Sequence, residues 1–82
     1  MRKIEIYTRP GCGYCTHAKR LLAGEGLPFV EYDVYRQPKY RTQMQRRTRG
    51  STYPQVLIND VAIGGFNELL ALQENKLLPG VY

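Results

Sequence analysis

The sequence predicts an α/β fold in which four β-strands form one mixed sheet flanked by three helices, in the order β-α-β-α-β-β-α. Short β-rich segments alternate with segments whose apolar residues recur at helical spacing. A helical segment separates the first two strands, which makes them parallel with a right-handed crossover. Two residues separate the last two strands, as is typical of an antiparallel hairpin. Residues 1–82 are expected to form a single domain.

The first strand and the first helix flank the most informative stretch of the chain. Residues 4–7 are short, β-rich and alternating, which indicates a strand. Ala18, Leu21 and Leu22 then recur at helical spacing, and Gly24 and Gly26 end the helix. The strand-to-helix turn between them therefore contains Arg9-Pro10-Gly11-Cys12-Gly13-Tyr14-Cys15.

The middle of the chain predicts a strand and a polar helix. Residues 29–34 alternate and are expected to form the second strand. From residue 37 to about residue 48 the chain is strongly polar, with Tyr40 and Met44 as an apolar i, i+4 pair. This pattern favours a surface helix opened by Pro38.

The last third predicts a hairpin followed by a helix. Residues 55–58 and 61–63 are β-rich and flank Asn59-Asp60, which suits a tight turn. Two glycines then break the pattern. A helix is expected from residue 66 to about residue 75, with Asn67 as its cap, followed by a tail to residue 82.

Cys12 and Cys15 are the only two cysteines. The unpaired N–H groups and the dipole at a helix N-terminus favour a thiolate, most of all at Cys12, and the i, i+3 spacing permits a disulfide. A structural zinc site takes four ligands, and with His17 as the only histidine it would need a carboxylate. A structural disulfide closing so small a loop would restrain the unfolded chain little. The remaining roles for the cysteine pair are redox chemistry and the binding of a metal between two protomers.

The charge and hydropathy narrow the function classes. A net charge of +5, with Arg46, Arg47 and Arg49 clustered beside Arg41, raises a nucleic-acid hypothesis. The chain shows no groove-reading helix or RNP-type strand, and a basic surface also suits small anions or acidic proteins, so no nucleic-acid partner is expected. No stretch reaches signal-peptide or transmembrane length, so we expect a soluble, cytoplasmic protein without membrane contact. In that reducing compartment a CxxC motif indicates redox chemistry.

Local motifs run along nearly the whole chain. They are Tyr7-Thr8-Arg9, Cys12-Gly13-Tyr14-Cys15, Ala18-Lys19 with Leu21-Leu22, Thr52-Tyr53-Pro54-Gln55 and Gly64-Gly65-Phe66-Asn67-Glu68-Leu69. The element order, with a dithiol at the first strand-to-helix turn, resembles the thioredoxin-like fold, and these motifs resemble the glutaredoxin family of the dithiol CxxC type.

The resemblance implies a glutathione-dependent thiol-disulfide oxidoreductase of cell redox homeostasis and electron transport. Cys12 would take the glutathionyl group from a mixed disulfide and be regenerated by free glutathione, which is a co-substrate rather than a tightly bound cofactor. Cys15, the less exposed thiol, would resolve mixed disulfides formed with protein disulfides. The implied partners are glutathionylated or disulfide-containing proteins and, indirectly through glutathione, glutathione reductase. A monomer is expected.

The resemblance also suggests where glutathione binds. Arg9 and Arg49 are candidates for its glycyl carboxylate, because a guanidinium forks onto a carboxylate. The backbone N–H groups of Asn67 and Glu68 are candidates for the γ-glutamyl carboxylate, and their side chains for the ammonium. The predicted set is completed by Tyr14, Thr52, Gly65 and a cis Tyr53-Pro54 peptide whose Tyr53 backbone would meet the cysteinyl part.

Two sites depart from the family pattern. Gly13 stands where dithiol glutaredoxins usually carry proline, and Asn67-Glu68 replaces a more usual pairing with Asp. Some relatives without that proline bridge a [2Fe-2S] cluster between two protomers, using the first cysteine of each and two glutathiones. Binding or transfer of such a cluster is therefore the alternative function, with Cys12 as the metal ligand, although bulky Tyr53 would hinder that dimer.

Overall fold

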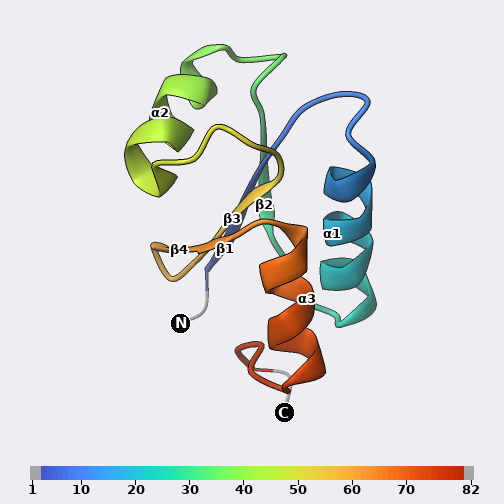
Figure 1. The fold of residues 1–82 in the computed structure, drawn as a ribbon. Coiled ribbons are helices and arrows are strands. Elements are labelled where there is room, and N and C mark those ends of the chain that lie inside the picture. Colours follow the sequence, from blue (N-terminus) through green and yellow to red (C-terminus); the bar gives the residue numbers. More distant parts are fainter. Residues whose placement is uncertain (1–2, 81–82) are drawn as a thin grey trace.

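The structure is a computed structural model that describes residues 3–80. The elements in this part of the chain follow the predicted order (Figure 1). They are β1 (Ile4–Thr8), α1 (Gly13–Gly24), β2 (Val30–Asp33), α2 (Lys39–Thr48), β3 (Gln55–Ile58), β4 (Val61–Gly64) and α3 (Phe66–Glu74). None of these helices is long and apolar enough to cross a membrane.

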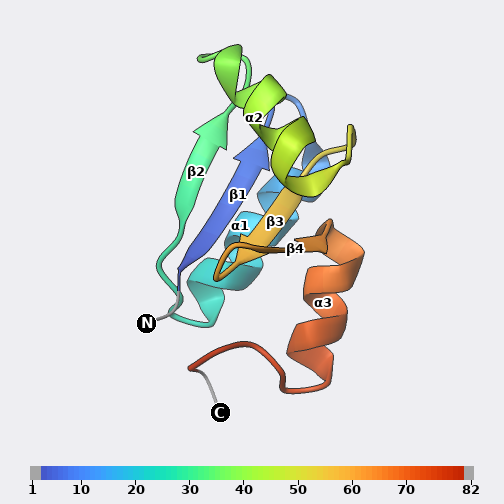
Figure 2. The same ribbon diagram turned by 90° about the vertical axis from the view of Figure 1, so that its left-hand side faces the viewer.

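The four strands form one mixed sheet in the order β2-β1-β3-β4, as predicted. β1 is parallel to β2 and antiparallel to β3, and β4 is antiparallel to β3. Helices α1 and α3 cover one face of the sheet and α2 covers the other (Figures 1 and 2). Because β1 and β2 are parallel, their carboxyl ends lie side by side at one edge of the sheet, where the N–H of Val34 donates to the carbonyl of Thr8 at 3.0 Å.

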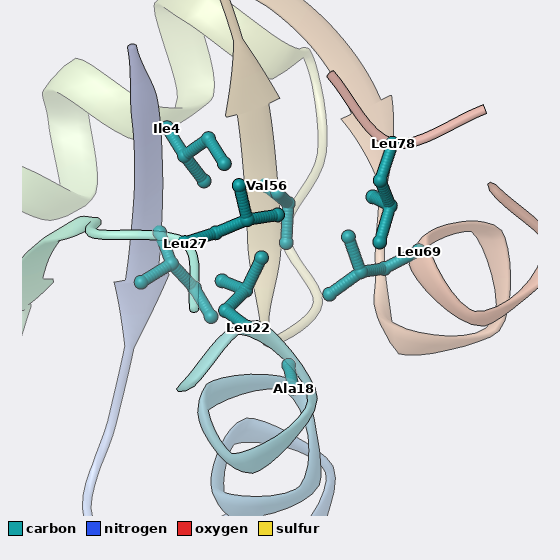
Figure 3. Close-up of a cluster of buried hydrophobic side chains, with 8 residues drawn as sticks. Ile4, Ala18, Leu22, Leu27, Val56, Leu69 and Leu78 are labelled. Atoms are coloured by element: carbon teal, nitrogen blue, oxygen red, sulfur yellow. The ribbon is translucent and has the colours of Figure 1, made fainter. Parts of the chain in front are cut away.

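Each face of the sheet buries its own apolar cluster. Between the sheet and helices α1 and α3, aliphatic side chains converge from the strands, both helices and the tail (Figure 3). Under α2 the cluster contains Tyr7, Met44 and Leu57, with Tyr32 and Tyr40 packed against it. β1 is packed on both faces by these two clusters, and this packing positions the turn that follows β1. The first cluster comprises Ile4, Ile6, Ala18, Leu22, Leu27, Val56, Leu69 and Leu78.

The α2 face also buries a carboxylate. The Glu5 side chain is 2% exposed, and both of its oxygens accept hydrogen bonds from the Arg47 guanidinium, at 2.8 and 2.9 Å. The Tyr32 hydroxyl donates to the same carboxylate at 2.8 Å. Arg47 holds the pKa of Glu5 down to about 2, against 4.5 ordinarily. This ion pair fixes α2 on β1.

Most element boundaries agree with prediction to within two residues, and the hairpin turn is as expected. Asn59 and Asp60 have φ of 51° and 67°, the left-handed conformation that a type I′ turn requires. The predicted cap of the last helix is wrong. Gly65 is the N-cap, because α3 begins at Phe66 and the Glu68 carboxylate accepts the Gly65 N–H at 2.7 Å. Asn67 is instead in the first turn.

Candidate active site

Cys12 caps the N-terminus of α1. After β1 the chain turns through Gly11, at φ 71°, and Cys12 then adopts an extended backbone just before the helix. The Sγ atom of Cys12 accepts a hydrogen bond from the N–H of Cys15 at 3.2 Å. A helix leaves its first N–H groups without carbonyl partners, and here one of them points at sulfur. The geometry stabilises negative charge as it develops on that atom.

The two free thiols differ in their surroundings. Cys12 is 8% exposed and Cys15 is 2% exposed, so Cys15 is the less accessible thiol, as predicted. Burial, reinforced by the hydrogen bond with Cys12, raises the pKa of Cys15 to about 12. Cys15 therefore stays protonated near neutral pH while the pair is reduced.

This difference predicts selective alkylation of the native protein. Iodoacetamide at about pH 8.5, the ordinary pKa of a thiol, is expected to modify Cys12 and to leave Cys15 unmodified, because the reagent needs an accessible thiolate. Mass spectrometry of the intact protein and of its tryptic peptides measures this. The urea-unfolded protein, in which both thiols should react, is the control. Equal labelling of both cysteines in the native protein would contradict the assignment.

The loop before β3 lies against Cys12. The Tyr53-Pro54 peptide is cis, which confirms the prediction from family resemblance. The Cys12 thiol lies 3.7 Å from the Tyr53 carbonyl oxygen, to which it can donate. The side-chain amide of Gln55 holds the loop by donating to the carbonyl and the hydroxyl of Thr52, both at 3.0 Å. A β-carbon added at Gly65 would lie 3.2 Å from the Pro54 carbonyl oxygen, so the start of α3 approaches this loop closely.

A groove of about 220 Å³ lies between this loop and α3, and we call it the α3-side groove. Seven of the residues predicted to bind glutathione line it together. Phe66 also lines it, although in the sequence it showed only as an apolar position of a helix. The lining residues are Tyr14, Thr52, Tyr53, Pro54, Gly65, Phe66, Asn67 and Glu68.

The first turn of α3 supplies donors to this groove. Leu69 is the first residue of the helix whose N–H reaches back to a carbonyl, that of Gly65, at 3.1 Å. The N–H groups of Asn67 and Glu68 lie in the turn before it, where helix geometry provides no carbonyl partner. Such a turn attracts a carboxylate or phosphate.

The two predicted arginines lie in different places. Arg9 lines a second pocket, of about 500 Å³, together with Cys12 and Cys15, and its guanidinium lies 5.8 Å from the centre of the Tyr53 ring. Arg49 is exposed at the C-cap of α2 and lines neither pocket in the described structure. Its contact with glutathione stays a prediction. Sequence reasoning missed Lys19, Glu31 and Asp33, which line the second pocket because β2 lies beside β1.

Replacing the two glycines on either side of Cys12 by alanine is expected to change the free energy of unfolding in opposite directions. Gly13→Ala is expected to raise the free energy of unfolding by about 0.5–1 kcal/mol, because a β-carbon meets no atom within 4 Å in this first helical residue. Gly11→Ala is expected to lower it by about 1–2 kcal/mol, since φ is 71° there. Urea denaturation measures both variants. Equal effects would contradict the local backbone account.

Comparison with known proteins agrees with this geometry. Residues 4–63 match the glutaredoxin family model. The chain belongs to the glutaredoxin family. It is 39% identical over 72 residues to glutaredoxin 3 of Escherichia coli K12, covering 88% of this chain and 87% of that protein.

Solved glutaredoxin structures have the same fold. The solution structure of glutaredoxin from Brucella melitensis matches this glutaredoxin with a TM-score of 0.74 and 45% identity, covering 89% of this chain and 79% of that one. The buckwheat glutaredoxin-glutathione complex matches with a TM-score of 0.83 over 98% of this chain and 76% of that one, at 21% identity. The likeness to the buckwheat protein concerns the fold alone. Family membership makes this glutaredoxin a thiol-disulfide oxidoreductase.

Proposed function

We propose that this glutaredoxin reduces glutathione mixed disulfides and protein disulfides at the expense of glutathione, with Cys12 as nucleophile and residues 1–82 acting as one cytoplasmic, monomeric domain. One observation carries the proposal. Cys12 lies against the Tyr53 carbonyl, at 3.7 Å, and the loop of Tyr53 forms one wall of a groove that ends at the first turn of α3. A tripeptide with a carboxylate at each end suits a groove that has a thiol against one wall and ends at unpaired N–H groups.

The proposed reaction has two thiol exchanges. The Cys12 thiolate attacks the glutathione sulfur of a mixed disulfide, so that a new sulfur–sulfur bond forms and the target leaves as its thiolate. Glutathione thiolate then attacks the glutathione sulfur of the Cys12 mixed disulfide, releasing the Cys12 thiolate and glutathione disulfide. Glutathione reductase and NADPH reduce the latter. The N–H of Cys15, 3.2 Å from Cys12 Sγ, stabilises the departing thiolate in the second step.

The α3-side groove suggests how glutathione is held. The N–H groups of Asn67 and Glu68 would receive the γ-glutamyl carboxylate, and the Glu68 carboxylate would face the ammonium. The Tyr53 backbone would pair with the cysteinyl part, which places the glutathione sulfur beside Cys12. Arg9 and Arg49 would meet the glycyl carboxylate. The buckwheat glutaredoxin, which shares this fold, was solved with glutathione.

Cys15 has a separate proposed role. When the target is a protein disulfide, attack by Cys12 leaves a mixed disulfide between Cys12 and the target. Cys15 then attacks the Cys12 sulfur, expels the target thiolate and forms the Cys12–Cys15 disulfide, which two glutathiones reduce. In the reduced pair the pKa of Cys15 is raised to about 12, so Cys15 stays protonated and leaves the first attack on a substrate to Cys12.

The direct test measures reduction of the mixed disulfide of glutathione and 2-mercaptoethanol, coupled to NADPH through glutathione reductase. We expect turnover that requires glutathione. Replacing glutathione by dithiothreitol separates glutathione dependence from general disulfide reduction. Failure of the wild type to turn over the mixed disulfide would sink the proposal.

Arg9 is expected to act mainly on regeneration of the enzyme. Its guanidinium lines the pocket of Cys12, so Arg9→Ala should slow release of the Cys12 thiolate by glutathione about tenfold. Attack by Cys12 should change less, because losing charge stabilisation also makes the remaining thiolate more nucleophilic. Stopped-flow measurement of each half-reaction, with Arg20→Ala as the exposed control, checks this. A loss confined to the first half-reaction would contradict it.

Binding or transfer of a [2Fe-2S] cluster stays the alternative prediction. Within residues 3–80, no group of three or more His, Cys, Asp or Glu side chains is placed to hold a metal ion, so each protomer would offer Cys12 and take further ligands from glutathione. Anaerobic reconstitution with iron, sulfide and glutathione tests this. A coloured dimer that Cys12→Ser cannot form would support a cluster carrier.

A further inference from the structure

The excess positive charge of this protein is confined to one segment. Residues 34–59 contain six Lys or Arg residues and no Asp or Glu, whereas the rest of the chain contains six basic and seven acidic residues. The segment comprises the connection from β2 to α2, α2 itself, the loop that follows it and β3. Charge segregated in this way steers an oppositely charged partner toward one side of a protein.

The topology brings the start of this segment to the dithiol. Because β1 and β2 are parallel, the residues after β2 lie beside the turn that holds Cys12. A pocket of about 510 Å³ is lined by Lys19, Glu31, Asp33, Arg36, Gln37 and Tyr40. The first three of these also line the pocket of Cys12 and Cys15. The two pockets are thus adjacent, and together we call them the β2-side groove, which extends from the thiols to the start of α2.

The acidic side chains of the β2-side groove already have partners within the protein. Glu31 accepts hydrogen bonds from the Thr8 hydroxyl at 2.6 Å and from the Lys19 ammonium at 3.0 Å. Asp33 accepts from the backbone N–H groups of Tyr35 and Arg36, at 2.8 and 3.3 Å. The charge of Glu31 is therefore offset by Lys19, whereas Asp33 keeps its charge and is held by backbone N–H groups.

Two cations at the α2 end of the groove are not held by carboxylates of the described residues: Arg36 lines the groove, and the Lys39 ammonium lies 5.7 Å from the ring centre of the lining residue Tyr40. Within residues 3–80 the ion pairs with carboxylates involve Lys3, Lys19 and Arg47, so Arg36 and Lys39 have none. Both are exposed. Tyr35, the residue directly before Arg36 in the sequence, is 78% exposed. Tyrosine and arginine are the side chains that most often anchor protein interfaces.

The β2-side groove and the α3-side groove flank Cys12 on different sides. The sheet order is β2-β1-β3-β4, so the turn after β1 lies between β2 and the loop before β3. A glutathione bound in the α3-side groove with its glycyl carboxylate at Arg9 would reach only the part of the β2-side groove next to Cys12, and would leave open the part lined by Arg36, Gln37 and Tyr40. Both halves of a mixed disulfide therefore have a surface of their own.

We propose that the β2-side groove, with its rim of Tyr35, Arg36 and Lys39, docks an acidic segment of the protein whose disulfide reacts at Cys12. The inference rests on the proposed function, since it names the partner of the same thiol. Arg9, Arg36 and Lys39, which have no carboxylate partner among the described residues, outnumber Asp33, the one lining carboxylate without a cation there, and so select acidic over basic segments. The exposed aromatic ring adds contact area that does not depend on salt.

Two synthetic peptides test the proposal. Each carries one glutathionylated cysteine, flanked by a run of glutamates in one peptide and by glutamines at the same positions in the other. At low salt the glutamate peptide is expected to show a kcat/KM about tenfold higher. In about 1 M NaCl, where the Debye length is about 3 Å, the ratio should approach one. Equal kcat/KM for both peptides at low salt would overturn the proposal.

Charge-reversed variants locate the surface. Arg36→Glu/Lys39→Glu should lose the preference for the glutamate peptide, while its activity on the mixed disulfide of 2-mercaptoethanol stays within about twofold of wild type. Arg20→Glu/Lys76→Glu makes the same change in net charge on exposed residues that do not line the groove, and should keep most of the preference. Equal loss in both double variants would mean that net charge alone acts, and would overturn the proposed site. Circular dichroism checks that both variants fold.

A binding measurement separates this inference from the proposed function. Fluorescence anisotropy of a labelled glutamate peptide, with serine in place of cysteine, needs no turnover. Salt-sensitive binding that requires Arg36 and Lys39 would support the docking surface even if the wild type reduced no mixed disulfide. A mixed-sequence oligonucleotide that binds more tightly and displaces the peptide would overturn it in favour of nucleic acid.

Discussion

Cys12→Ser is expected to lower kcat/KM for a glutathione mixed disulfide at least about a thousandfold, equivalent to about 4 kcal/mol of transition-state stabilisation. The serine hydroxyl keeps its proton at neutral pH, so it cannot replace the thiolate in either thiol exchange. Cys15→Ser should retain most of this activity, because neither exchange uses Cys15. The coupled assay with glutathione reductase measures all three proteins.

Cys15 should be needed for the reduction of protein disulfides, although it is not needed for glutathione mixed disulfides. Resolution of the Cys12–target disulfide needs a second thiol, and the N–H of Cys15 on Cys12 Sγ shows that the two residues are adjacent. Cys15→Ser should therefore accumulate a covalent complex with a disulfide-containing substrate, visible on a non-reducing gel. Equal loss of mixed-disulfide reduction in both variants would mean that the dithiol is needed throughout, and would contradict the two roles.

Arg47→Met is expected to lower the free energy of unfolding by about 3–5 kcal/mol, because it leaves the buried Glu5 carboxylate with only the exposed Lys3 ammonium, 3.9 Å away, as a cation. The protein is small, with an expected stability of about 4–12 kcal/mol, so this is a large fraction. Arg41→Met is the matched control: Arg41 lies on the same helix, is exposed and has no ion pair in the described structure. Its effect should stay within about 0.5 kcal/mol. Urea denaturation measures both.

The same ion pair sets a pH dependence. The pKa of Glu5 is about 2 in the folded protein and 4.5 ordinarily, so folding favours the ionised carboxylate. The stabilisation, about 3 kcal/mol, is complete above pH 4.5 and is lost as the pH falls toward 2. Arg47→Met should remove this loss. Should Arg47→Met not fold, Arg47→Lys, which keeps the charge without the paired N–H groups, should retain part of it. An unchanged pH profile would refute the role of Arg47.

The sequence determined the elements and the chemistry of the thiols. Periodicity and turn residues are local properties, which is why the strand, helix and hairpin patterns, with Cys12 at the strand-to-helix turn, could be predicted. The candidate glutathione residues were found by motif resemblance, which fixes residue types at set separations. The helix cap was misplaced because Asn67 suits a cap by type, whereas the cap is decided by where the Glu68 carboxylate reaches Gly65.

Only the tertiary structure decided which distant side chains meet. Glu5 alternates with apolar residues and gave no sign that α2 would cover it, because burial under Arg47 depends on a contact 42 residues along the chain. Lys19 and Glu31 likewise line the pocket of Cys12, and Arg36 lines the adjacent pocket, only because β2 lies parallel to β1. Sequence patterns report forces between neighbours in the chain. Ion pairs and grooves depend on packing between elements, and that packing exists only once the sheet has formed.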